Sequence, residues 1–189
     1  MTGIIILAAG PSSRLGRPKQ NLVYKGETLL QRAVNLACAP SSALVIVVLG
    51  ANEEEVAPTI ENKKVTIVKN LDWREGMASS IRAGITMIQD ITPEITSVIL
   101  MLCDQPFVDT ALIDQLIQKK QAKGIVACAY NDAIGPPVLF DKKYFDELLL
   151  LKGQEGAKKL LLKLPDDVET IPFPLGSVDI DTMGDYEKL

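Results

Sequence analysis

Five short apolar runs recur along the chain, and segments with helical periodicity lie between them. The first run, residues 4–7, is uninterrupted and rich in β-branched side chains, as in a central strand that is buried on both faces. The other runs occupy residues 43–49, 65–68, 98–102 and 125–129. Helical patterns are expected over residues 28–37, from 53, over 77–88 and over 110–123. This alternation predicts an α/β, Rossmann-like fold with a mainly parallel sheet and helices on both faces.

The loop after the first run has the composition of a polyphosphate-binding turn. Residues 8–11 read Ala-Ala-Gly-Pro, so the backbone is free to approach a ligand closely. Ser12 and Ser13 offer hydroxyl groups, and Arg14, Arg17 and Lys19 add three positive charges. A solvated basic turn is the simpler interpretation, but the chain carries a formal net charge of −4, and a bound polyanion explains a local basic cluster better. The spacing is neither that of a P-loop nor that of a G-x-G-x-x-G dinucleotide loop.

Composition limits the chemistry and the partners. The 189 residues suit a single domain, and the net negative charge argues against nucleic acid or an anionic membrane as a partner. Three widely spaced cysteines and no long apolar segment favour a reducing, cytoplasmic setting. The chain has no histidine, which excludes Ser-His-Asp and Cys-His catalysis and histidine-ligated metals. A metal would have to be held by oxygen ligands.

Carboxylates at strand ends can supply those ligands. Asp104 follows the run at 98–102, although an isolated Asp there can equally cap the next turn. Asp179 and Asp181 would point the same way in an extended segment, or would simply line an exposed strand face. The carboxyl ends of parallel strands share one edge of the sheet, so we expect several polar side chains to lie together around one cleft mouth at that edge. They are Arg14, Lys19, Asn52, Asn70 and Asp104. The single tryptophan, Trp73, is interpreted as a local packing anchor in preference to a stacking platform.

The motifs resemble those of a known family. The stretch L-A-A-G-P-S-S-R-L-G-R-P-K-Q at 7–20 resembles the signature of the MobA-like nucleotidyltransferases, and in detail that of the molybdenum cofactor cytidylyltransferase group. Matching pieces are N-L-D-W-R-E-G-M-A-S-S-I-R-A-G at 70–84, C-D-Q-P at 103–106, G-Q-E-G-A-K-K-L-L at 153–161 and D-I-D-T at 179–182. The resemblance implies a GT-A-like nucleotidyltransferase fold in one domain, 1–189. Residues 1–129 would bind nucleotide and residues 130–189 the acceptor.

The resemblance also implies an activity and a set of site residues. A substrate phosphate would attack the α-phosphorus of a nucleoside triphosphate and release pyrophosphate. The residues implied in nucleotide binding are Leu7, Ala8, Ala9, Gly10, Ser12, Arg14, Lys19, Asn70 and Ser80. Arg14, Lys19 and Asp104 would be catalytic, with Mg²⁺ on Asp104 and assistance from Asp181. Ala9 and Pro18 match the cytidylyl-type pattern, which implies CTP as donor. The resemblance as a whole implies a molybdopterin-type phosphorylated acceptor and a client molybdoenzyme.

Two departures from the family pattern lie in the acceptor part. Gln154 follows Gly153 where the family usually has Asp, and Pro136 stands where it often has His or Asn. Other phosphorylated acceptors therefore stay open, namely a sugar phosphate, methylerythritol phosphate or a different cofactor phosphate. A non-catalytic nucleotide-binding factor for molybdoenzyme maturation is a further alternative. A dinucleotide-dependent oxidoreductase is disfavoured because no G-x-G-x-x-G follows the first strand.

Overall fold

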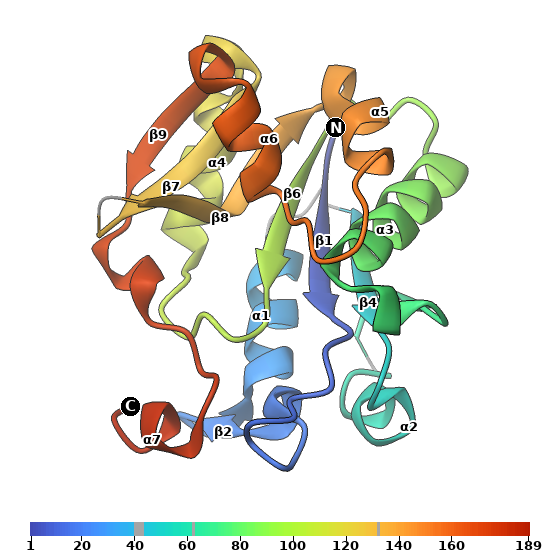
Figure 1. Cartoon of the computed structure of the whole chain (residues 1–189), viewed down its shortest axis with the longest axis vertical. Coiled ribbons are helices and arrows are strands. Elements are labelled where there is room, and N and C mark those ends of the chain that lie inside the picture. The colour runs from blue at the N-terminus through green and yellow to red at the C-terminus, as the bar shows by residue number, and fades with distance from the viewer. Residues whose placement is uncertain (40–43, 62, 132) are drawn as a thin grey trace.

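The computed structural model describes residues 1–39, 44–61, 63–131 and 133–189, and its centre is one seven-stranded sheet (Figure 1). The strand order is β5-β4-β1-β6-β8-β7-β9. The strands are β1 (Thr2–Ala8), β4 (Leu44–Leu49), β5 (Thr66–Lys69), β6 (Ser97–Leu102), β7 (Ile125–Tyr130), β8 (Ala133–Asp141) and β9 (Val168–Pro172). A separate hairpin pairs β2 (Val23–Tyr24) with β3 (Glu27–Thr28). Ala43, the first residue of the predicted second strand, lies outside the described residues.

The pairing confirms the mainly parallel sheet. Strand β1 pairs in parallel with β4 and β6, β4 with β5, and β7 with β9. Among the described strands of the seven-stranded sheet, only β8 runs antiparallel to its neighbours, which are β6 and β7. The carboxyl ends of β1, β4, β5 and β6 therefore meet at one edge of the sheet. The loops that follow these four strands are placed next to one another.

Helices cover both faces, as predicted. The longer ones are α1 (Leu29–Cys38), α3 (Met77–Ile91) and α4 (Thr110–Lys123). Short ones are α2 (Glu53–Val56), α5 (Phe145–Leu149), α6 (Lys158–Lys163) and α7 (Met183–Tyr186). The 3₁₀ turns are Lys19–Asn21, Ala57–Thr59, Trp73–Glu75, Lys142–Tyr144, Pro165–Asp167 and Pro174–Ser177. Thr28 and Gln31 form a capping box that fixes the start of α1, and the Asp109 side chain accepts from the Leu112 N–H at the start of α4. No helix in the described ranges is both long and apolar enough to span a bilayer.

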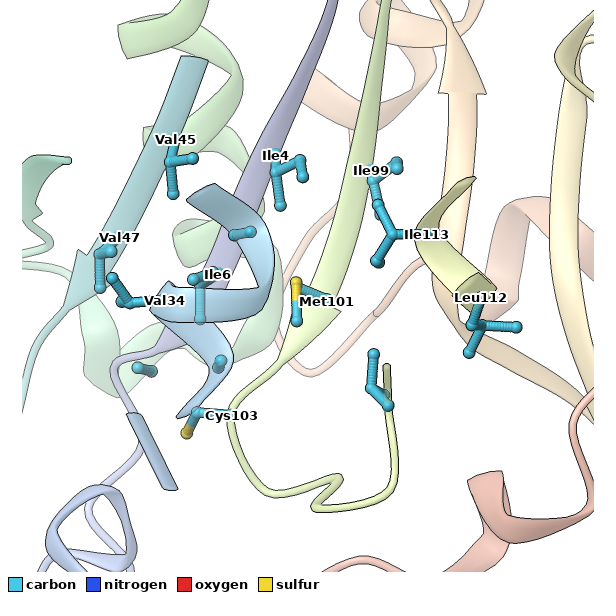
Figure 2. Close-up of a cluster of buried hydrophobic side chains, with 14 of the residues drawn as sticks. Ile4, Ile6, Val34, Val45, Val47, Ile99, Met101, Cys103, Leu112 and Ile113 are labelled. Atoms are coloured by element: carbon cyan, nitrogen blue, oxygen red, sulfur yellow. The ribbon is translucent and has the colours of Figure 1, made fainter. Parts of the chain in front are cut away.

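Two apolar clusters hold the layers together. On one face, Ile4 and Ile6 of β1 pack with residues of α1 and α4, and Figure 2 shows Val34 and Ile113 in this cluster. On the other face, Ile5 packs with residues of α3, α5 and α6. Residues 4–6 are completely buried, which explains the uninterrupted apolar run. Burying one such side chain stabilises the fold by about 1.5–3 kcal/mol. The buried centre makes β1 a rigid support for the loop at its end.

Candidate active site

The loop after β1, the Asp104 loop after β6 and the C-terminal segment meet at one end of the sheet. The Ile180 N–H donates to the Asp104 carbonyl oxygen over 3.1 Å, which ties the C-terminal segment to the end of β6. Figure 1 shows that segment, in red, at the same end of the molecule as the blue loop that follows β1. Side chains that are far apart in the sequence are thus brought to a common surface.

Four charged side chains form a network there. Lys19 Nζ lies 2.5 Å from Asp104 Oδ2 and 2.9 Å from Asp181 Oδ1. Arg14 Nη2 donates to Asp181 Oδ2 over 2.7 Å. The side chains of Lys19 and Asp104 are only 16% and 11% exposed, whereas that of Arg14 is 67% exposed. Lys19 therefore neutralises two carboxylates in a largely desolvated position, and Arg14 covers the site from the solvent side.

The network shifts the proton affinities of its members. Burial alone would lower the pKa of Lys19, but the charge and hydrogen bond of Asp104, with the hydrogen bond to Asp181, raise it above its ordinary value. Burial opposes the hydrogen bonds and charges of Lys19 and Arg14 at Asp181, and the net result is a lowered pKa for that carboxyl. The pKa of Asp179 is raised, first by partial burial and then by repulsion from Asp104 and Asp181. In the part of the chain described, Asp181 joins the ion pairs and Asp179 does not.

The network lies at the edge of a pocket of about 530 Å³. We name it the nucleotide pocket after the role that the resemblance predicts for the residues that line it. Of the predicted residues, those that line it are Leu7, Ala9, Gly10, Lys19, Ser80 and Asp104. An adjoining hollow of about 170 Å³ is lined by Ser12, Arg14 and Asp181 and shares Gly10 and Lys19 with the larger pocket. Ala8 belongs to the buried cluster on the opposite face, beside α1. Ala8 can therefore contribute only backbone atoms to the site.

Asn70 acts from behind the pocket wall. Its Nδ2 donates to Ser79 Oγ over 2.8 Å and to Ser80 Oγ over 3.0 Å, and its Oδ1 accepts from the Asp72 N–H. Asn70 is buried, so it orients Ser80 and the turn after β5. The expectation that Asn52 shares this mouth is wrong. Asn52 lines a separate pocket with residues 53–55 of α2 and does not line the pocket that holds Lys19 and Asp104.

Sequence reasoning missed several residues that build the pocket. Gln20 is buried, and its Nε2 donates to the carbonyl oxygens of Ala8 and Gly10 over 2.7 and 3.3 Å. This amide fixes the shape of the small-residue loop. Trp73 packs against the apolar cluster of α3, as expected, yet it also lines the pocket, where Arg74 lies over its ring at 4.4 Å. The run of small residues and the single tryptophan were visible in the sequence, but which partners they face depends on the fold.

The segment 152–157 closes the pocket on its other side. The Gly153 N–H donates to Glu75 Oε1, and the Gly153 carbonyl oxygen accepts from the Ala78 N–H, each over 3.1 Å. Gly76 permits this close approach, since a Cβ at that position would lie 2.4 Å from the Gly153 oxygen. Gln154, which the sequence assigned only to the acceptor part, consequently lines the nucleotide pocket as well.

The carboxylates fit a cation site that a phosphate completes. Within the described ranges, no group of three or more His, Cys, Asp or Glu side chains could enclose a metal by itself. Asp104 Oδ1 is nevertheless buried without a hydrogen-bond partner, so one carboxylate oxygen is available. Mg²⁺ is usually bound by one or two carboxylates together with substrate phosphates. Asp104 and Asp181 match that donor set.

Three known proteins resemble the chain over nearly its full length. Nicotine blue oxidoreductase of Paenarthrobacter nicotinovorans is 36% identical over 201 aligned residues, which cover 100% of this chain and 96% of that protein. Molybdenum cofactor cytidylyltransferase of Escherichia coli K12 is 26% identical, with 96% and 92% covered. The crystal structure of Rv0371c from Mycobacterium tuberculosis superposes with a TM-score of 0.86 at 31% identity, covering 99% of this chain and 96% of that one. A manganese complex of Rv0371c gives a TM-score of 0.81 at 29% identity, with 100% and 97% covered.

The family comparison gives the same result. Residues 4–168 match the MobA-like NTP transferase domain, so the match extends from β1 to the start of β9 and includes Lys19 and Asp104. Asp181 and the rest of the C-terminal segment lie beyond the matched part. The resemblance that the motifs suggested is confirmed, and the chain belongs to the MobA-like NTP transferase family.

Proposed function

We propose that this protein transfers CMP from CTP to the phosphate of a molybdopterin-type acceptor and releases pyrophosphate. The observation that carries the proposal is the position of Lys19, which joins Asp104 to Asp181 where the nucleotide pocket meets the small-residue loop. Cationic side chains that bind phosphate and carboxylates that can hold a metal ion are groups that phosphoryl chemistry uses. The choice of CTP is supported by Ala9 and Pro18 and by the name of the Escherichia coli relative.

The proposed reaction needs no general base. An oxygen of the acceptor phosphate, already anionic near neutral pH, forms a bond to the α-phosphorus. The bond from that phosphorus to the bridging oxygen breaks, and its electron pair leaves with pyrophosphate. Lys19 and Arg14 bind the β- and γ-phosphates, and so exchange carboxylate oxygens for phosphate oxygens when CTP enters. Their charge offsets the negative charge that develops on the leaving group.

A divalent cation would complete the site. Asp104 and Asp181 would hold Mg²⁺, which supplies further charge neutralisation to the triphosphate. The unpartnered Asp104 Oδ1 and the manganese complex of Rv0371c support this assignment. Lys19 contacts the same two carboxylates, so its ammonium group and the cation would together offset the negative charges of Asp104 and Asp181.

We assign the two substrates to different parts of the chain. Residues 1–129 supply the loop, Lys19 and the nucleoside pocket, and residues 130–189 supply the acceptor side within a single domain. Asp181 is an exception, because it comes from the C-terminal segment yet faces the phosphate-binding loop. A cytoplasmic location and a client molybdoenzyme are proposed on the same basis, from the cysteine content and the acceptor.

An oxidoreductase is a second candidate. The specific observation in its favour is the 36% identity to a relative that is named nicotine blue oxidoreductase. Against it, the loop after β1 lacks the G-x-G-x-x-G spacing and carries cations suited to a triphosphate. Oxidation of a reduced nicotinamide nucleotide in the presence of nicotine blue, followed by absorbance, tests this candidate directly.

The main test is a thermal-shift panel of CTP, GTP, ATP and UTP with Mg²⁺, followed by a pyrophosphate-release assay with CTP and molybdopterin. A ligand at 100 times its Kd stabilises the fold by about 2.7 kcal/mol. We expect CTP to raise the unfolding midpoint most and pyrophosphate to appear only with the acceptor present. A CTP-selective shift without pyrophosphate favours the non-catalytic maturation factor. No selective shift with any of the four nucleotides contradicts the proposal.

A further inference from the structure

Gln105 follows Asp104 directly, but its side chain binds a different part of the chain. Its Nε2 donates to the Pro136 carbonyl oxygen over 3.1 Å and to the Gly176 carbonyl oxygen over 3.0 Å. Pro136 belongs to β8, and Gly176 to the 3₁₀ turn that precedes Asp181. One amide group therefore joins three segments, which are the loop after β6, the first half of β8 and the C-terminal segment.

We propose that Gln105 is a positioning residue, whose two hydrogen bonds hold the C-terminal segment against the loop after β6 so that the Asp181 carboxylate faces the phosphate and cation site. In the described ranges, Gln105 lines neither the nucleotide pocket nor the hollow beside it, so it acts through Asp181 and not by contact with a ligand. The inference rests on the proposed function, in which Asp181 is a cation ligand.

The orientation of the Gln105 amide is dictated by its partners. Two carbonyl oxygens can bind only the donor end of an amide, so Nε2 must face them and Oε1 points elsewhere. Gln105 is only 7% exposed, and among the residues described its Oε1 has no hydrogen-bond partner. A buried acceptor without a partner destabilises the folded state. A methionine of similar length would bring no such acceptor, so the link to the C-terminal segment explains the glutamine better than stability does.

The bond to Gly176 lies between two other contacts of the C-terminal segment. On one side, the Phe173 N–H donates to a carbonyl oxygen of β7 over 2.9 Å. On the other side, the Ile180 N–H donates to the Asp104 carbonyl oxygen over 3.1 Å. Loss of the Gln105 bond should therefore let the stretch before Ile180 move, and Asp181 with it.

Asp181 is sensitive to such a movement. Its two carboxylate oxygens have different partners, Lys19 Nζ over 2.9 Å and Arg14 Nη2 over 2.7 Å. Hydrogen bonds weaken steeply with distance and angle, so a displacement of about 1 Å would disrupt both contacts and misplace the oxygens for a cation. The position of the segment thus decides whether Asp181 can act in the site.

The main test is a double-mutant cycle between Gln105 and Asp181, with CTP present and Mn²⁺ binding measured by electron paramagnetic resonance. Gln105→Met keeps the length of the side chain and removes both hydrogen bonds, so we expect Mn²⁺ affinity to fall threefold to tenfold. In the Asp181→Asn background the same substitution should cause no further loss, because the group through which Gln105 acts is already changed.

Gln31→Met is the matched control. The Gln31 amide also donates to a backbone carbonyl oxygen, that of Thr59 over 3.0 Å, but it has no link to the C-terminal segment among the described contacts. This variant should bind Mn²⁺ as the wild type does. The thermal midpoint of each variant verifies that it folds.

Hydrogen exchange gives a second measurement that needs neither nucleotide nor metal. The Ile180 N–H should exchange at least tenfold faster in Gln105→Met than in the wild type or in Gln31→Met. Faster exchange at this position would show directly that the Gln105 side chain holds the segment that carries Asp181.

Unchanged Mn²⁺ affinity in Gln105→Met overturns the proposal, as does unchanged exchange at Ile180. An equal loss of Mn²⁺ affinity in the wild-type and Asp181→Asn backgrounds overturns it too, because Gln105 would then act independently of Asp181. If Gln105→Met does not fold, Gln105→Asn takes its place with the same expected losses, since its shorter amide cannot reach both carbonyl oxygens. A failure of the transferase function looks different: CTP would then neither bind selectively nor yield pyrophosphate, while Ile180 would still exchange faster in the Gln105 variant.

Discussion

Lys19 and Asp104 stand 85 positions apart in the sequence, and 2.5 Å separates the ammonium nitrogen of one from a carboxylate oxygen of the other. Their contact joins the loop after β1 to the loop after β6, two adjacent parallel strands. Asp181 completes the cluster from the C-terminal segment. The first prediction concerns the cation at the centre of this arrangement.

Lys19→Ala should reduce turnover by a factor of about 10²–10³, which corresponds to roughly 2.7–4 kcal/mol of lost transition-state stabilisation. The variant also leaves two neighbouring carboxylates without their cation, so its free energy of unfolding should fall by about 1–3 kcal/mol. Pyrophosphate release and chemical denaturation measure the two effects.

The double variant Lys19→Ala/Asp104→Asn should recover stability but not turnover. Lys69→Ala, which removes an exposed pair with Glu53, is the matched control. Unchanged turnover in Lys19→Ala would contradict the catalytic assignment.

The sheet topology explains why the Lys19–Asp104 contact was predictable from the sequence. Buried β-branched runs identify parallel strands, and parallel strands place their following loops at one edge. That rule needs no knowledge of side-chain packing. It does not apply to Asp181, which reaches the site through a hydrogen bond between the Ile180 N–H and the Asp104 carbonyl oxygen. It also wrongly included Asn52, because the rule ignores which way a loop turns after its strand.

Strand β8 shows a second limit of the sequence. Gly135, Pro136 and Pro137 make an irregular sequence with no strand pattern, yet they lie inside β8. Ala127 is paired with Val138 and Cys128 with Gly135, so the two prolines fall in an irregularity of the ladder. Proline lacks an N–H group, and such a bulge tolerates it. Pro136 also lines a mainly apolar pocket with Leu7 and Leu102, and a local sequence pattern cannot reveal that contact.

Two adjacent serines should respond differently to truncation. Ser80 lines the nucleotide pocket, whereas Ser79 donates to the Gly76 carbonyl oxygen. Ser80→Ala should raise the Kd for CTP about threefold to tenfold, because one hydrogen bond is worth roughly 0.5–1.5 kcal/mol. Ser79→Ala should lower the unfolding midpoint with a smaller change in that Kd. Calorimetric titration with CTP checks both variants. An equal loss of affinity in the two would show that Ser80 acts only through the helix start.

Metal binding should depend on the two clustered carboxylates. With CTP present, Asp104→Asn should weaken Mn²⁺ binding at least tenfold, and Asp181→Asn should weaken it less because that residue is more exposed. Electron paramagnetic resonance of free Mn²⁺ measures this binding without relying on turnover. Asp179→Asn is the control, since Asp179 lies two positions from Asp181 without joining the ion pairs among described residues. If Asp179→Asn and Asp181→Asn lost the same amount of Mn²⁺ affinity, the binding would depend on the net charge of the segment and not on coordination by Asp181.

The Glu75–Arg82 pair should contribute stability that disappears in acid. Hydrogen bonds from Arg82 and from the Gly153 N–H lower the pKa of Glu75 from 4.5 to about 2. Because the folded-state pKa is depressed, the stabilisation is complete above pH 4.5 and is lost as the pH falls toward 2. Glu75→Gln should therefore lower the thermal midpoint at pH 6 and make little difference near pH 2. Glu94→Gln, at an exposed glutamate, serves as the control. If the difference in thermal midpoint between Glu75→Gln and the wild type did not change with pH, the loss of stability would come from packing and not from the charge of Glu75.

The last prediction concerns Gly76, where backbone conformation and close packing coincide. Its φ of 127° is one that residues with a side chain rarely adopt, and a Cβ there would lie 2.4 Å from the Gly153 carbonyl oxygen. Gly76→Ala must therefore strain the backbone and also push the 152–157 segment away from α3. Gly16 has a φ of 68° with open space around its Cβ position, so Gly16→Ala isolates the conformational cost, about 1–2 kcal/mol. Both variants should be less stable, but only Gly76→Ala should weaken the binding of CTP, because Gly76 and Gln154 both line the nucleotide pocket. Calorimetric titration with CTP measures the affinity. If Gly76→Ala loses stability and binds CTP as the wild type does, the 152–157 segment does not shape the nucleotide pocket.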